Sequence, residues 1–196
     1  MITLQTDRLT IRNFRAGDAE ALFAYLHKPS ASCFFSLKLD DLKAAEIEVL
    51  KRARNDEYLA VCLTQTGEVI GDLFVHPDPT WPEDGENSEH DTVSVGWNFN
   101  PLFGGRGYAF EAAKALCADL FARENIRRIY AYVEDHNTAS RRLCEKLGMR
   151  EEGLFIEYVT FQNDENGNPV YENTMQYAIL RREWNTAKSP DLRPPA

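Results

Sequence analysis

The sequence has no long apolar stretch, no cysteine pair at metal-binding spacing and no overall excess of basic residues. No window approaches the roughly 18 consecutive apolar residues of a membrane span, so no membrane segment is expected. The four cysteines and four histidines are scattered, which argues against a metal site or a disulfide framework and favours reduced thiols. The first residues, MITLQTDRLTIRNF, lack the basic start and apolar run of a secretory signal, so a cytoplasmic location is expected.

The charge of the chain is negative but unevenly spread. The 196 residues carry a formal net charge of −9, whereas a nucleic-acid-binding protein needs a basic face, so no nucleic-acid partner is expected. Residues 101–150 nevertheless hold nine Lys and Arg against six Asp and Glu, a local net charge of +3. This pattern favours an anionic ligand in that region and a cationic partner elsewhere, although solvated helix faces would give the same excess.

The stretch PLFGGRGYAFEAAKAL, residues 101–116, brings three glycines and an arginine directly into a predicted helix. Glycines without Cβ atoms let an anion, most often a phosphate, approach the unpaired N–H groups of the first helical turn. Two nucleotide motifs fail here. A P-loop needs a lysine and a hydroxyl after the last glycine. A dinucleotide fingerprint needs a glycine where Phe110 stands, and Glu134 comes too late to hold a ribose.

Hydrophobic periodicity predicts seven strands and four helices in the order β-α-α-β-β-β-α-β-α-β-β. The order predicts an α/β or α+β fold with a mixed sheet, in one domain over residues 1–185. The tail 186–196 is polar and rich in proline, so disorder is expected there. The predicted helices are 18–26 with Asp18 as its cap, 41–54, 109–123 and 137–147; the strands are 9–14, a hairpin over 58–75, 93–99, 127–133 and a terminal hairpin over about 153–180.

Two motifs together resemble a known family. The run GGRGYAFEA follows a strand containing Gly96 and Trp97, and DHNTASRRLCEKLGM comes after it; the pair is similar to the GNAT superfamily of acetyl-CoA-dependent N-acetyltransferases, over about residues 8–184. Within it, GRGYAFEA, NTAS and EKLGM most resemble the Rim-type enzymes, which acetylate N-terminal amines of ribosomal proteins. The resemblance implies the GNAT fold, a mostly antiparallel mixed sheet of about seven strands flanked by about four helices.

The resemblance also implies the binding residues for acetyl-CoA. The loop N–H groups would hold its pyrophosphate, a backbone N–H of the preceding strand would bond the thioester carbonyl, Asn137 would contact the pantetheine arm and Ser140 would lie near the sulfur. The implied set is Trp97, Asn98, Phe99, Gly104, Gly105, Arg106, Gly107, Tyr108, Ala109, Asn137 and Ser140. One position departs from the family pattern: Gly104 stands where a larger side chain is usual.

In GNAT enzymes the amine attacks the thioester directly, so the protein must take a proton from the amine and return one to the sulfur. Many relatives protonate the sulfur with a tyrosine where this chain has Cys144; the Rim type uses the serine, so Ser140 is the expected donor. The segment GLFIEYV resembles the region of the Rim type that carries a glutamate working through water, so the resemblance implies Glu157 as the base; Glu89 and His90 are alternatives. No histidine is placed to activate Cys144 as a nucleophile.

The acceptor is expected to be a primary amine. The loop from residue 76 to 91 holds six acidic residues and no Lys or Arg, which favours a cationic amine such as a peptide N-terminus. Two alternatives stay open: acetylation of a small amine, such as a polyamine or an antibiotic, and a non-catalytic acyl-CoA-binding module. The resemblance also implies a homodimer, formed through the terminal hairpin or elements near it.

Overall fold

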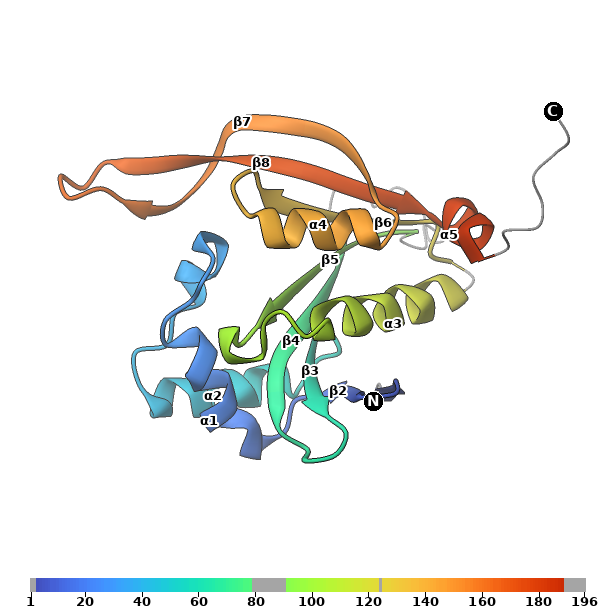
Figure 1. Ribbon diagram of the computed structural model, residues 1–196. Coiled ribbons are helices and arrows are strands. Elements are labelled where there is room, and N and C mark those ends of the chain that lie inside the picture. The colour runs from blue at the N-terminus through green and yellow to red at the C-terminus, as the bar shows by residue number, and fades with distance from the viewer. Residues whose placement is uncertain (1–2, 79–90, 124, 189–196) are drawn as a thin grey trace, which may run out of the picture.

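One sheet of eight strands runs through the computed structural model, which describes residues 3–78, 91–123 and 125–188 (Figure 1). The strands lie in the order β1-β2-β3-β4-β5-β6-β8-β7. Their bounds are β1 Thr3–Gln5, β2 Leu9–Asn13, β3 Tyr58–Leu63, β4 Val69–Pro77, β5 Thr92–Phe99, β6 Arg128–Glu134, β7 Arg150–Asn163 and β8 Pro169–Leu180. The helices are α1 Ala19–Leu26, α2 Leu42–Arg52, α3 Tyr108–Ala122, α4 Thr138–Lys146 and α5 Arg181–Lys188, with 3₁₀ turns η1 Ala16–Asp18, η2 Ser32–Leu37 and η3 Pro101–Phe103.

Strands β5 and β6 form the parallel pair in a sheet whose other neighbouring strands are antiparallel. Their ladder is short: it joins Thr92, Val93 and Ser94 to residues 128–130 and then ends. Each strand continues beyond this point, so the two diverge and leave an opening in the middle of the sheet. The mixed, mostly antiparallel sheet confirms the expected fold class.

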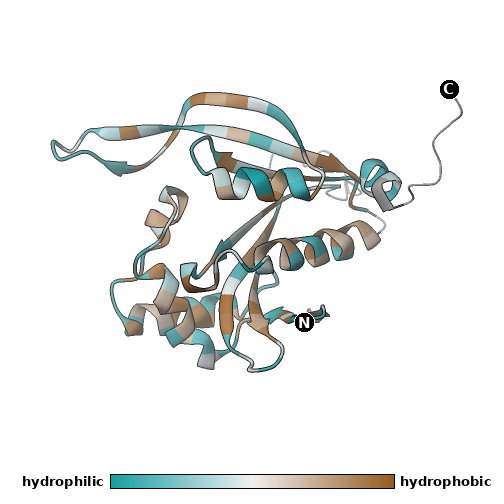
Figure 2. Cartoon of the chain, in the orientation of Figure 1, coloured by the Kyte–Doolittle hydropathy of each residue, from teal (hydrophilic) through white to brown (hydrophobic). Residues whose placement is uncertain are grey.

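Helices cover both faces of the sheet, because each helix is amphipathic and buries its apolar side. One core packs α3, α4 and the start of α5 on the sheet, around residues such as Leu116, Ile129 and Leu147. A second core packs α1 and α2 on the opposite face, around Leu22 and Val49. Hydrophobic and hydrophilic residues alternate around α3 and α4 in Figure 2, as this arrangement requires.

Strands β7 and β8 form a long hairpin that projects beyond the body of the molecule and passes over η2 (Figure 1). A hydrogen bond from Ser32 Oγ to Glu172 Oε2, 2.6 Å long, ties η2 to this hairpin. The hairpin therefore lies over η2, on the side of the sheet where α1 and α2 also pack.

Three local expectations need correction. The described chain has an eighth strand, β1, and a fifth helix, α5, whose last residues fall in the predicted tail; residues 189–196 lie outside the described part. The carboxylate of Asp18 does not cap α1. It accepts from the Arg15 backbone N–H at 2.7 Å and pairs with Arg12 at 2.8 Å, so its oxygens bind donors outside α1.

Candidate active site

The glycine loop leads directly into α3, and two of its glycines have a left-handed backbone. Gly105 and Gly107 adopt left-handed φ angles of +73° and +80°, which favour glycine. Gly107 is the N-cap of α3, and the first N–H bonded within the helix is that of Glu111, to the Gly107 carbonyl at 3.1 Å. The N–H groups of the three residues before Glu111 have no partner inside the helix, and the helix dipole favours an anion there.

Arg8, which directly precedes β2, holds the glycine loop in place. Its Nε donates to Glu111 Oε2 at 2.7 Å, its Nη1 donates to the Arg106 carbonyl at 3.1 Å, and its guanidinium lies 4.6 Å from the Tyr108 ring centre. Burial alone would raise the pKa of Glu111, but hydrogen bonds from Thr6 and Arg8 outweigh it and lower that pKa. Glu111, the glutamate of the GRGYAFEA motif, therefore stabilises the loop through its bonds to Arg8.

The position of Gly104 has a local explanation. Its N–H bonds to the Pro101 carbonyl at 3.0 Å, and a Cβ there would lie 3.1 Å from the same oxygen, tighter than nearly all real contacts. The turn that closes η3 therefore leaves little room for the larger residue that the family pattern has at this position.

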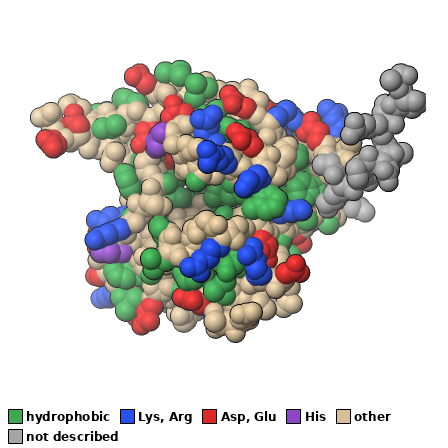
Figure 3. All heavy atoms as spheres, in the orientation of Figure 1, with side chains coloured by type: hydrophobic (Ala, Val, Ile, Leu, Met, Phe, Trp, Pro, Cys, Tyr) green, Lys and Arg blue, Asp and Glu red, His purple; other side chains and the backbone are tan. Residues whose placement is uncertain are grey.

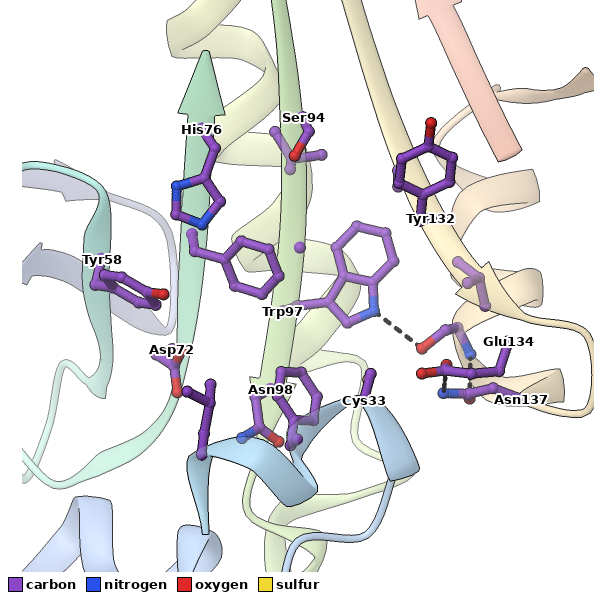
Figure 4. A pocket seen from close by; sticks show the side chains of 18 of the residues that line it. Cys33, Tyr58, Asp72, His76, Ser94, Trp97, Asn98, Tyr132, Glu134 and Asn137 are labelled. Atoms are coloured by element: carbon purple, nitrogen blue, oxygen red, sulfur yellow. Dashed lines mark hydrogen bonds between the residues drawn. The ribbon is translucent and has the colours of Figure 1, made fainter. Parts of the chain in front are cut away.

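At the start of α4 the predicted residues form one hydrogen-bonded chain. Asn137 Oδ1 accepts from the Ser140 backbone N–H at 3.2 Å and caps the helix. Across the opening, Trp97 Nε1 donates to Ser140 Oγ at 3.2 Å (Figure 4). Asn137 Nδ2 lies 3.4 Å from Glu134 Oε2. Trp97, Asn137 and Ser140, which are far apart in the sequence, therefore meet at the point where β5 and β6 separate.

Two cavities meet at this point. The strand cavity, about 270 Å³, is lined mainly by β4, β5 and β6 together with η2. The helix cavity, about 520 Å³, is lined by the start of α4, by Ala109 of α3 and by the end of β5. The residues that line both cavities are Phe34, Trp97, Asn98, Asn137 and Ser140. A substrate in one cavity would thus lie directly against a substrate in the other.

Lys and Arg side chains gather on both sides of the hollow between α3 and α4, the face onto which the helix cavity and the glycine loop open (Figure 3). These helices belong to the basic block of residues 101–150. A positive field at this entrance suits a phosphorylated ligand.

The strand cavity carries carboxylates that the sequence analysis missed. Glu134, 5% exposed, and Asp72, 2% exposed, both line it. Burial raises the pKa of Asp72, and the nearby Arg52 opposes that rise. From the sequence, Glu134 enters only as a possible ribose ligand of a dinucleotide site. The alternation of RRIYAYVE would have placed it on the same face as Tyr132, but not beside an opening.

The other predicted residues fall in different places. Asn98 lines both cavities and Phe99 the helix cavity, whereas residues 104–107 form the loop and Tyr108 begins α3, next to Ala109. Glu157 is exposed on β7 and is not among the residues that line either cavity. Glu89 and His90 lie outside the described residues. Cys144 is fully buried and burial raises its pKa to about 12, so it has no thiolate to act as a nucleophile.

A family model described as an acetyltransferase (GNAT) domain matches residues 8–150. The chain belongs to the GNAT acetyltransferase family. Among curated proteins it is 31% identical to the uncharacterized N-acetyltransferase YnaD of Bacillus subtilis, covering 93% of this chain and 99% of that protein. Among solved structures it is similar to a GNAT-family acetyltransferase from Bacillus anthracis, with 27% identity, a TM-score of 0.77 and coverage of 92% and 99%.

This GNAT chain is therefore an N-acetyltransferase. The Rim-type assignment is not established. A ribosomal-protein-S5-alanine acetyltransferase from Vibrio fischeri has a TM-score of 0.69 with coverage of 94% and 99%, but at 16% identity it shares the fold alone. In the described part of the chain, no helix combines the length and apolar character of a membrane span. No described group of acidic, His or Cys residues could hold a metal ion.

Proposed function

We propose that this GNAT enzyme transfers the acetyl group of acetyl-CoA by direct attack of a primary amine, and that the acceptor is the N-terminal amine of a peptide or protein. The observation that carries the proposal is the meeting of the two cavities at Trp97, Asn98, Asn137 and Ser140. Acetyl-CoA would occupy the helix cavity and the amine would enter through the strand cavity. The amine nitrogen bonds to the thioester carbon, the carbon–sulfur bond breaks, and one proton passes from nitrogen to base and one from acid to sulfur.

We expect the chain to supply hydrogen-bond donors to three parts of acetyl-CoA: the pyrophosphate, the pantetheine arm and the thioester. The N–H groups at the start of α3 would bind the pyrophosphate, with the Arg106 side chain adding positive charge, and Asn137 would contact the pantetheine arm. The described ladder between β5 and β6 ends at Ser94, so N–H groups on that edge further along β5 are available to a thioester carbonyl. A donor at that oxygen would stabilise the oxyanion that forms during attack.

Titration calorimetry with acetyl-CoA tests the proposed binding mode. We expect saturable binding that weakens at least about tenfold in Gly107→Val, since a β-branched side chain strains the left-handed backbone and blocks the N–H groups. Gly67→Val is the matched control. Gly67 also has a left-handed φ, +74°, but lies in the β3–β4 turn with open space around it. Equal affinities in the two variants would contradict the predicted site.

Asn137 needs a variant that separates capping from ligand contact. Ser is also a good N-cap, but it has no amide N–H to donate, and unlike Asp it places no second carboxylate beside Glu134. We expect Asn137→Ser to retain most of the thermal stability of the protein and to bind acetyl-CoA about tenfold more weakly, because a donated hydrogen bond is lost. If Asn137→Ser binds as tightly as the native protein, Asn137 acts as a helix cap alone.

Ser140 is the proposed proton donor to the sulfur. The indole N–H of Trp97 can only donate, so Ser140 Oγ accepts that bond and keeps its own proton free for another partner. We expect Ser140→Ala to lower kcat by about 100-fold while acetyl-CoA affinity changes by less than about threefold. Stopped-flow detection of the released thiol measures the first quantity and calorimetry the second. A kcat within about threefold of the native value would remove Ser140 from this role.

A small cationic amine is the second candidate acceptor. The strand cavity is modest in volume and holds the buried carboxylate Glu134, which would attract a protonated amine, whereas the Asp72 carboxylate there is already paired with Arg52. Mass spectrometry of products from peptide and polyamine panels separates the two classes. Acetylation of polyamines with no acetylation of any peptide would replace the peptide proposal.

A further inference from the structure

We propose that Tyr132, Phe155 and Tyr158 form a second acceptor subsite, which binds an apolar side chain of the residue that follows the reacting N-terminal residue of a peptide. The inference rests on the proposed function, since it assumes that the amine enters the strand cavity. It goes further by naming the chemistry of the peptide that this enzyme would select.

The three rings form one cluster that leads out of the strand cavity. Tyr132 lines the cavity and is 47% exposed (Figure 4). Its ring centre lies 6.2 Å from that of Phe155 and 6.0 Å from that of Tyr158, and the last two are 5.0 Å apart. Tyr158 is 53% exposed on the hairpin. An exposed aromatic surface that continues a substrate cavity marks a binding site for an apolar group.

The strand register places this cluster within reach of the second residue of a bound peptide. Glu134 pairs with Thr174, and Thr174 pairs with Phe155, so the three side chains share one face of the sheet. Tyr132 lies two residues from Glu134 on β6 and therefore on this face too, about 7 Å further along. An extended peptide advances about 3.5 Å per residue. With its amine at Glu134, the side chain of its second residue reaches the rings, whereas a small amine would leave them uncovered.

A backbone irregularity brings Tyr158 to the other two rings. Between the pairs Phe155–Thr174 and Val159–Glu172, three residues of β7 stand opposite Asn173 alone. Glu157, in the middle of this bulge, has a left-handed φ of +49°. Bulges re-aim side chains, and backbone strain in a non-glycine residue is found at functional sites. Asn173 holds the bulge, because its Oδ1 accepts from the Glu157 N–H at 2.9 Å.

The same asparagine ties the bulge to the reaction centre. Asn173 Nδ2 donates to Asp135 Oδ2 at 2.8 Å, and Asp135 lies in the turn between β6 and Asn137. The subsite and the α4 cap are therefore built on one connected piece of structure.

The charges around the cluster select an apolar group over an acidic one. The carboxylates near the cluster include Glu134, in the cavity, Glu172, which is bonded by Ser32, and Asp78, whose charge acts on Tyr132. All three would repel an acidic second residue. Gln176, the partner of Tyr132 on β8, is neutral.

Arg128 is a cation whose charge also acts on Tyr132, but its guanidinium is paired with Glu152 at 2.6 Å. The aromatic rings therefore favour burial of a Leu, Met or Phe side chain.

Steady-state kinetics on four peptides that differ only in the second residue test the subsite. We expect kcat/KM to be about tenfold higher for Leu than for Asp, with Ala and Lys between them, a ratio typical of an apolar pocket. Tyr158→Ala should bring the Leu-to-Asp ratio close to about two, and Tyr158→Phe should keep it. Tyr171→Ala is the matched control: Tyr171 is 55% exposed on the same hairpin, but it faces the opposite side from Glu172.

Three results would overturn the subsite: no discrimination by the native enzyme, a preference for Lys, or equal ratios in Tyr158→Ala and Tyr171→Ala. Light scattering on the same variants adds a fourth. If Tyr158→Ala changes the molecular mass in solution and leaves the ratio unchanged, the rings form an interface between two copies of this chain.

Peptide affinity in the presence of CoA is measured in parallel. An affinity order of Leu over Asp without any turnover would support the subsite and contradict the proposed function.

Discussion

Replacing Glu134 by glutamine is expected to lower kcat by about 10²- to 10⁴-fold, the range for loss of a general base. Glu134 lines the strand cavity, where the amine would enter, and adjoins Asn137 and Ser140 at the junction with the helix cavity. Glutamine has the same shape but cannot accept the proton that the amine must lose. Acetyl-CoA affinity should stay within about threefold of the native value, which rapid-quench kinetics and calorimetry together would show.

The neighbours of Glu134 hold its carboxylate in place. Asn137 Nδ2 approaches one oxygen at 3.4 Å. Burial, followed by the charge of Glu134, raises the pKa of the Cys33 thiol, so the thiol stays protonated and is a hydrogen-bond donor to the carboxylate. We therefore propose Glu134 as the base, since it lies where a bound amine would be.

Glu157→Gln is the matched control, because Glu157 is the base that the sequence predicted. It is exposed and lies outside the residues that line both cavities, so its loss should change kcat by less than about threefold. The opposite result, a large loss in Glu157→Gln with a small one in Glu134→Gln, would restore the earlier assignment and remove Glu134 from the reaction.

Replacing Arg52 by alanine is expected to cost about 3–5 kcal/mol of unfolding free energy, because it leaves the buried carboxylate of Asp72 without a counter-charge. The Arg52 side chain is 1% exposed; its Nε contacts Glu48 Oε1 at 2.8 Å and its Nη1 lies 3.3 Å from Asp72 Oδ2. Tyr25 donates to the other oxygen of Asp72 at 2.8 Å. For a chain of this size the loss would lower Tm by roughly 10 °C in a thermal melt.

The double variant Arg52→Met/Asp72→Asn tests the cause of this instability. Asparagine keeps an acceptor for Tyr25 and removes the negative charge, so the double variant should be more stable than Arg52→Met alone. The Arg52→Ala deficit should also shrink in acid. Burial already raises the pKa of Asp72, loss of Arg52 would raise it further, and a neutral Asp72 no longer needs a counter-charge. If the single and double variants unfold alike, the charge pairing is not the source of the stability.

A surface pair serves as the control for Arg52. Lys38 and Asp40 lie 3.8 Å apart with mostly exposed side chains. Solvent screens such a pair, so Lys38→Ala should change the free energy of unfolding by less than about 0.5 kcal/mol.

Much of the candidate site could be predicted from the sequence because its signals are local. The glycines of GGRGYAFEA set a left-handed turn and an open helix N-terminus within a few residues, and NTAS places a cap and a hydroxyl one helical turn apart. The two motifs were assigned to one site by resemblance, and the structure brings Trp97, Asn137 and Ser140 together.

The proposed base, Glu134, was harder to predict because its position depends on distant contacts. Glu157 follows a motif like that of the Rim type, but the bulge in β7 displaces the residues around it from regular alternation. Glu134 ends a regular strand, and the sequence RRIYAYVE does not show that pairing with β5 ends at Ser94.

By itself the sequence determined the order of helices and strands from β2 to β8, the open helix N-terminus after the glycine loop and the cap at the start of α4, and it carried the two motifs whose resemblance implied acetyl transfer. Hydrogen bonding and side-chain periodicity act over three or four residues, so a linear pattern is enough for these features. The tertiary structure alone decided where β5 and β6 part, which carboxylates face the opening and which rings surround its rim. Those depend on strand register, on a bulge and on buried charge pairs, whose partners lie tens of residues apart in the chain.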